Sequence, residues 1–170
     1  MAEPNEITIE TAADYHISGL TETKGALLGV DFGDKRTGLA LCDALRMLSA
    51  GIGTISPGGI ERTADAIAEE AKRRGVSGIV IGHPINMDGS EGPRSKRAVK
   101  LARLLKERTG LPIGLFDERM STMNAARFLN ETNTRGEKRK AVIDTLSAEI
   151  ILQNALDKLR FMREREEADT

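Results

Sequence analysis

The chain has 170 residues, the usual size of one domain, and is too short for two full ones. Apolar residues make up 39% of it, and no run of them reaches the roughly 18 that a membrane span needs, which excludes an integral membrane protein. Lys and Arg number 25 against 26 Asp and Glu, a formal charge of −1, which argues against a histone-like polycation. The single cysteine, Cys42, cannot form a disulfide within the chain, so we expect a reducing, cytoplasmic location.

The two ends of the chain differ in composition from its middle. Residues 1–24 hold five acids against Lys24 alone, without a sustained hydrophobic period or a signal-peptide pattern, and predict a flexible acidic leader. Residues 157–170 hold five acids and four bases and predict a helix end that frays into solvent. Residues 25–156 then form one mildly basic domain, with 20 bases and 16 acids.

Apolar runs and helical periods alternate along this domain. Two short apolar runs flank the turn residues Gly33 and Asp34, which indicates a β-hairpin. The predicted elements are, in chain order, strands over 26–32, 37–42 and 51–55, a helix over 60–74, a strand over 78–82, a helix over 95–109, a strand over 111–116, a helix capped by Ser121 or Thr122, and a last helix that starts near residue 137 or 139. This order, βββαβαβαα, predicts an α/β fold in which a mixed sheet carries helices on its faces.

Three acidic positions stand at the ends or in the middle of apolar elements. Asp31 follows a buried run, where an unpaired charge would be costly, Asp117 and Glu118 follow another, and Asp144 lies among the apolar positions of the last helix. Each position alone has an ordinary explanation, as a turn acid, a helix start or a solvated helix flank. Together they form a ligand set for two hard divalent ions about 4 Å apart, as nucleases use. His16 and His83 are too few and too far apart for a zinc triad; His83 shapes its loop or serves as a general base.

Four segments, in this order, resemble the YqgF family, also called RuvX: residues 29–38 (GVDFGDKRTG), 82–92 (GHPINMDGSEG), 117–122 (DERMST) and 144–148 (DTLSA). The resemblance spans about residues 27–156 and implies a ribonuclease H-like fold with a mixed five-stranded sheet. It further implies a metal-dependent endonuclease in which Asp31, Glu118 and Asp144 hold Mg²⁺ or Mn²⁺. Family members are associated with maturation of the 5′ end of pre-16S ribosomal RNA and are also described as Holliday junction resolvases. His83 departs from the family pattern, in which an aliphatic residue is expected.

Basic residues gather around the second of these segments. Residues 92–109 hold seven bases and one acid, a density typical of a nucleic-acid contact, although a solvated helix face would look the same. Aromatic residues make up only 3% of the chain, so backbone charge and shape are favoured over base stacking as the means of recognition. The patch, the hairpin and the family segments together give the expected nucleic-acid contacts: Lys35, Arg36, Asn86, Asp88, Arg94, Lys96, Arg97, Arg119, Ser121 and Thr122.

Two other classes of protein share some of these sequence features with a nuclease. An actin-like or sugar-kinase-like phosphotransferase can use an early Asp-x-Gly hairpin, but it needs a second domain for which this chain has no room, and no Gly-x-x-x-x-Gly-Lys loop is present. A non-catalytic binding or ribosome-assembly factor is consistent with the basic patch, and the intact acids argue against it. We therefore expect structured RNA such as pre-16S rRNA, or branched DNA, as the partner, no membrane, and a monomer or weak homodimer in which Cys42 either packs in the core or lies at the interface.

Overall fold

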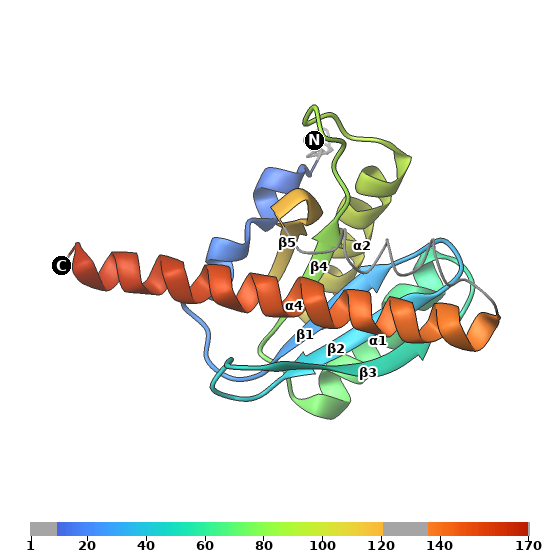
Figure 1. The fold of residues 1–170 in the computed structure, drawn as a ribbon, viewed down its shortest axis with the longest axis horizontal. Helices are drawn as coiled ribbons and strands as arrows, with labels where there is room; N and C mark the ends of the chain where they lie inside the picture. Colours follow the sequence, from blue (N-terminus) through green and yellow to red (C-terminus); the bar gives the residue numbers. More distant parts are fainter. Residues whose placement is uncertain (1–9, 121–135, 170) are drawn as a thin grey trace, which may run out of the picture.

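A five-stranded mixed sheet is the centre of the computed structural model, which describes residues 10–120 and 136–169. The strand order is β3-β2-β1-β4-β5 (Figure 1). β1, β2 and β3 pair antiparallel, whereas β4 pairs parallel with β1 and β5 parallel with β4. The strands are β1 (Leu27–Phe32), β2 (Thr37–Cys42), β3 (Ser49–Ile55), β4 (Gly78–His83) and β5 (Ile113–Asp117). The mixed α/β sheet predicted from the sequence is confirmed; the helix expected after Ser121 or Thr122 lies outside the described residues.

Helices cover both faces of this sheet. α1 (Ile60–Arg74) and α2 (Pro93–Thr109) share a core with the side chains of Leu28 and Val30 on one face. α4 (Glu137–Ala168) crosses the other face, where Leu27 packs against it (Figure 1). Side chains alternate between the two faces along a strand, so Asp31 lies on the α4 side, like Leu27. None of the helices in the described ranges is long and apolar enough to cross a membrane.

The predicted flexible leader is wrong for residues 12–20. Two short 3₁₀ helices, η1 (Ala12–Tyr15) and η2 (Ile17–Leu20), pack against β5 and bury Tyr15, Ile17 and Leu20. A β-bridge between His16 and Leu115 covers the edge of β5, which would otherwise present unpaired backbone groups. These apolar side chains recur too irregularly for a helical period, and the sheet edge is what makes their burial possible. Residues 1–9 lie outside the described residues.

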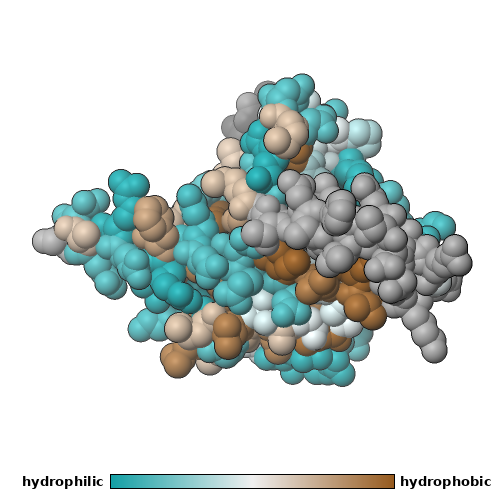
Figure 2. Space-filling view, in the orientation of Figure 1, coloured by the Kyte–Doolittle hydropathy of each residue, from teal (hydrophilic) through white to brown (hydrophobic). Residues whose placement is uncertain are grey.

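Cys42 packs inside the fold, whereas the far end of α4 is exposed to solvent. Cys42, at the end of β2, is buried; the backbone N–H of Leu27 donates to its Sγ at 3.1 Å, and burial raises the pKa of the thiol. Of the two explanations for this cysteine, the structure shows core packing, and a weak dimer stays a prediction. α4 continues beyond the sheet, where its surface is largely hydrophilic (Figure 2).

Candidate active site

Asp31 lies between two glycines of the neighbouring strands. Its partner on β2 is Gly38, by the antiparallel register of the hairpin. On β4, the parallel register pairs Val30 with Ile81, so the next residue on each strand places Gly82 beside Asp31. Asp31 therefore lies between two residues that lack side chains, on the face that α4 covers.

Asp144 reaches this end of the sheet because α4 passes directly over Gly38. A Cβ atom added at Gly38 would clash with the carbonyl oxygen of Asp144, so only glycine allows the helix backbone to lie this close to β2. Gly38 is the cross-strand partner of Asp31, and Asp144 therefore stands above the strand next to that residue. The close approach of a helix to a strand brings together two acids that are far apart in the sequence.

Glu118 occupies the other side of Asp31. It begins the short 3₁₀ helix η3 (Glu118–Met120) directly after β5, and a Cβ added at Gly82 would lie 2.7 Å from its Oε1. The Glu118 carboxylate thus lies over Gly82, on the same face as Asp31. Asp31, Glu118 and Asp144 lie at one end of the sheet and come from a strand, a strand end and a helix.

The neighbouring Asp117 has a different environment. It pairs with His83 across the strands, and its carboxylate accepts from Arg119 Nη2 at 2.7 Å and Nε at 3.0 Å. The Arg119 guanidinium holds the pKa of Asp117 below its usual range. The sequence pattern named both Asp117 and Glu118 as acids after this strand. In the structure, Glu118 lies over Gly82 and Asp117 pairs with Arg119.

The three acids suit a hard divalent cation by their chemistry. All are carboxylates, the oxygen ligands that Mg²⁺ and Mn²⁺ prefer, and the glycines at 38 and 82 let Asp144 and Glu118 approach the strands beside Asp31. Within residues 10–120 and 136–169, no three His, Cys, Asp or Glu side chains already stand at metal-binding distances. The Asp144 carboxylate instead accepts from Arg36 Nε at 3.1 Å. The chemistry of the three carboxylates therefore fits the metal, and one of them, Asp144, is paired with Arg36.

His83 lies on the opposite face of the sheet from this site. It is 3% exposed, and its Nε2 lies 3.3 Å from Glu91 Oε1 without the geometry of a hydrogen bond. Burial lowers its pKa, so the imidazole is neutral near pH 7. This placement agrees with a role in shaping the loop, whereas the three acids lie on the α4 face; a role as general base stays a prediction.

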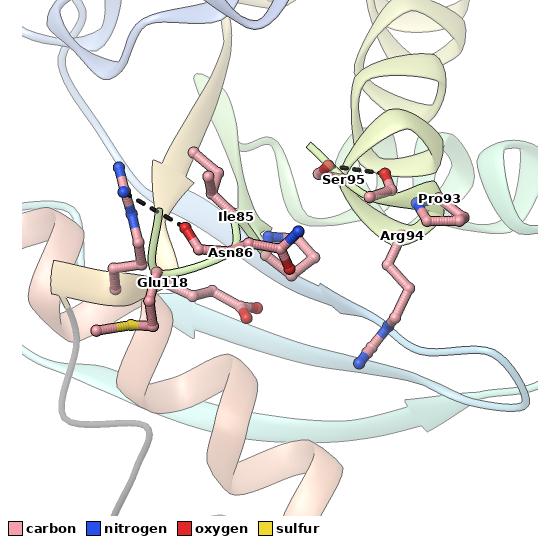
Figure 3. A pocket seen from close by; sticks show the side chains of 10 residues that line it. Ile85, Asn86, Pro93, Arg94, Ser95 and Glu118 are labelled. Carbon is pink, nitrogen blue, oxygen red and sulfur yellow. Dashed lines mark hydrogen bonds between the residues drawn. The ribbon is translucent and has the colours of Figure 1, made fainter. Parts of the chain in front are cut away.

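A pocket of about 480 Å³ opens beside Glu118 (Figure 3). We call it the loop pocket; it lies between the segment after β4, the start of α2 and η3. Its lining includes Ile85, Asn86, Pro93, Arg94, Glu118 and Arg119. Three of the expected nucleic-acid contacts, Asn86, Arg94 and Arg119, therefore line one pocket next to a candidate metal ligand.

The other expected contacts within the described residues lie in the β1–β2 turn, in the loop after β4 and on α2. Lys35 and Lys96 are exposed, and Arg97 donates to Asp34 at 3.1 Å and stacks on the Phe32 ring at 4.8 Å. Asp88 accepts from the backbone N–H and the hydroxyl of Ser90, so it shapes the loop turn. Ser121 and Thr122 lie outside the described residues. The sequence could not show that Arg36 and Arg97 are paired with acids of the fold.

Comparison with known proteins places these features in a family. Residues 25–158 match the model of the family described as RuvX, Holliday junction resolvase. A relative from Bradyrhizobium sp. (strain ORS 278), named "Putative pre-16S rRNA nuclease", is 44% identical over 86% of this chain and 91% of its own. A relative of the same name from Ruegeria sp. (strain TM1040) is 42% identical over 81% of this chain and 88% of its own.

A solved structure agrees with the fold. The chain of T. thermophilus RuvC, in complex with a Holliday junction substrate, superimposes with a TM-score of 0.50 at 13% identity, over 79% of this chain and 94% of that one. At this identity the likeness shows the fold, which is ribonuclease H-like. With the family match over most of its length and four of its segments in order, this chain belongs to the RuvX family.

Proposed function

We propose that the protein is a metal-dependent endonuclease that hydrolyses phosphodiester bonds in structured RNA, with 5′-end processing of pre-16S ribosomal RNA in the cytoplasm as its reaction. The observation that carries the proposal is the position of Asp31 between Gly38 and Gly82, with Asp144 above one glycine and Glu118 above the other. The names of the relatives, pre-16S rRNA nucleases, support the choice of substrate.

Asp31, Glu118 and Asp144 would hold Mg²⁺ or Mn²⁺ in this reaction. When bound, such ions would supply an activated water and offset negative charge on the phosphodiester, so no covalent nucleophile would be required. The chain itself supplies position and charge: Arg36 orients the Asp144 carboxylate, and Arg94 and Arg119 stand beside Glu118, where they attract a phosphate backbone.

Replacement of each acid by its amide tests the proposal. Asp31→Asn, Glu118→Gln and Asp144→Asn are each expected to abolish Mn²⁺-dependent cleavage of structured RNA, because each removes a charged ligand at nearly constant volume. Glu69→Gln, an exposed acid on the far side of the sheet, is the matched control and should cleave normally. Circular dichroism would verify that all four variants fold. Near-normal turnover in one of the three would remove that acid from the site.

Holliday junction resolution is the second candidate, and the description of the matching family favours it. A four-way junction has two-fold symmetry, so its resolution suits two copies of the chain acting together, whereas trimming one RNA strand needs one site. Cleavage of a four-way DNA junction and of a structured RNA by the same preparation, with sedimentation of each complex, distinguishes them. Tight binding of both without Mn²⁺-dependent cleavage of either would contradict both and favour a non-catalytic assembly factor.

A further inference from the structure

The loop pocket has the size and lining of a site for a small organic group. Pockets of about 300–1,000 Å³ commonly hold small ligands, and this one, at about 480 Å³, falls in that range. Apolar side chains form much of its wall, from Ile85 and Met87 on the loop and from Pro93 at the start of α2. Met87 is 87% exposed, which leaves a flexible apolar side chain at the rim. Such a lining suits a flat, partly apolar group better than a phosphate alone.

Charged side chains stand around the same pocket. The Arg119 guanidinium is fixed by Asp117, and its Nη1 donates to the Asn86 carbonyl oxygen at 3.5 Å, which joins η3 to the loop. Arg94 is exposed and extends from the first turn of α2 on the other side (Figure 3). Two cations thus flank an apolar cavity, an arrangement that matches a base with the phosphates on either side of it.

Glu118 sets the position of the pocket relative to the reaction. Its carboxylate lies over Gly82 beside Asp31, and the same residue lines the pocket (Figure 3). A group bound in the pocket is therefore adjacent to the bond that the carboxylate site would cut.

We propose that the loop pocket binds one unpaired nucleotide next to the scissile phosphate. This inference rests on the proposed nuclease function and specifies its substrate. A base stacked inside a duplex cannot enter a pocket lined by a loop and a helix, so the substrate must offer a nucleotide that is unpaired or easily unstacked at that position. Single-stranded and bulged RNA offer one, whereas a fully paired four-way junction does not. The low content of aromatic residues in the sequence argued against base stacking. The apolar part of the pocket wall is aliphatic, so no aromatic pattern in the sequence could indicate it.

The test uses a set of RNA hairpins in which one unpaired nucleotide is moved along the stem, with the fully paired hairpin as the reference. A matching set of DNA hairpins shows whether the pocket prefers an unpaired ribonucleotide or an unpaired deoxyribonucleotide. Affinities are measured with Asp144→Asn, whose changed residue lies outside the pocket, and cut positions are mapped with the wild type and Mn²⁺. A hairpin with its unpaired nucleotide next to the cut should bind about tenfold more tightly than the paired one, as burial of about 60 Å² of a base against apolar side chains allows.

Two variants on the Asp144→Asn background relate this preference to the pocket. Met87→Ala should reduce the tenfold ratio severalfold, whereas Met47→Ala, an exposed methionine on the β2–β3 hairpin, should leave it unchanged. Arg94→Ala should weaken binding of every hairpin, and Lys72→Ala on α1 should not. Equal affinity for all hairpins, or a ratio that Met87→Ala does not change, would overturn the proposal.

The outcome for the pocket is separable from that for the nuclease. If the wild type cuts paired and unpaired hairpins equally, the nuclease function stands and the pocket proposal is wrong. If the binding preference is found and responds to Met87→Ala without any Mn²⁺-dependent cleavage, the pocket proposal stands and the proposed nuclease function is wrong.

Discussion

Arg36 and Asp144 are 108 residues apart in the sequence and form an ion pair, with the Arg36 Nε donating to the Asp144 Oδ2 at 3.1 Å. The arginine comes from the turn between β1 and β2, and the acid comes from α4. Their side chains are 18% and 31% exposed, so water screens the pair only in part. The pair fixes a candidate metal ligand against the hairpin that carries Asp31.

Loss of this pair should change metal binding. Arg36→Gln is expected to strengthen Mn²⁺ binding severalfold, because the guanidinium no longer competes for Asp144, and to lower the free energy of unfolding by about 0.5–1 kcal/mol. Calorimetric titration with Mn²⁺ measures the first effect and denaturant unfolding the second. Arg36→Lys, which keeps the charge, should bind Mn²⁺ about as the wild type does. An unchanged Mn²⁺ affinity in Arg36→Gln would show that the pair and the ion do not compete.

Alanine at either glycine beside Asp31 should damage the site in a different way. Gly38→Ala places a methyl group against the α4 backbone and should cost about 1–3 kcal/mol of stability, because the helix must move. Gly82→Ala meets the Glu118 carboxylate and the Ile151 side chain, so it should reduce cleavage more than stability. Thermal unfolding and cleavage rates are compared with Gly19→Ala, where a Cβ meets nothing within 4 Å. Normal stability and cleavage in both variants would contradict this prediction and would mean that α4 can lie farther from the sheet without loss of function.

The arginines and lysine at the start of α2 should contribute unequally to RNA binding. Arg94→Ala and Lys96→Ala are each expected to reduce the slope of log affinity against log salt by about 1, because each removes one phosphate contact. Arg97→Ala should reduce the slope less and lower stability by about 0.5–1 kcal/mol, since Arg97 pairs with Asp34 and stacks on Phe32. Fluorescence anisotropy at several salt concentrations measures the slopes. Equal reductions of the salt slope in the three variants would contradict this prediction and would mean that Arg97 contacts the RNA as Arg94 and Lys96 do.

His83 should make stability depend on pH in the acid range. Burial lowers its folded-state pKa below the ordinary value of 6.5, with Glu91 and Asp117 favouring the charged form and Arg119 opposing it. The unfolded chain therefore takes up a proton near pH 6.5 that the folded protein accepts only at lower pH. The contribution of neutral His83 to the free energy of unfolding is therefore complete above pH 6.5. It falls as the pH drops below this value, by up to about 1.4 kcal/mol per pH unit.

His83→Leu removes that proton uptake. Its free energy of unfolding should fall less than that of the wild type between pH 6.5 and pH 5, while the carboxylates contribute equally to both. Urea unfolding at intervals of half a pH unit gives the difference between the two proteins. A constant difference across this range would contradict the assignment.

The sequence by itself determined the sheet, the main helices and the identity of the three acids. Period-two and helical patterns depend on neighbouring residues, so the strands and helices of residues 25–120 could be predicted within a few residues of their bounds. The four family segments singled out Asp31, Glu118 and Asp144 as the candidate metal ligands. These are properties of a residue and its near neighbours.

Only the tertiary structure decided which groups meet. The pairing of Arg36 with Asp144, the passage of α4 over Gly38 and the burial of His83 on the opposite face depend on the register between strands and on the approach of a helix from the far end of the chain. The packing of Tyr15 and Leu20 against β5 depends on a free sheet edge that no local pattern reveals. The loop pocket likewise exists because the segment after β4, the start of α2 and η3 converge, and their residues are separated in the sequence by whole elements.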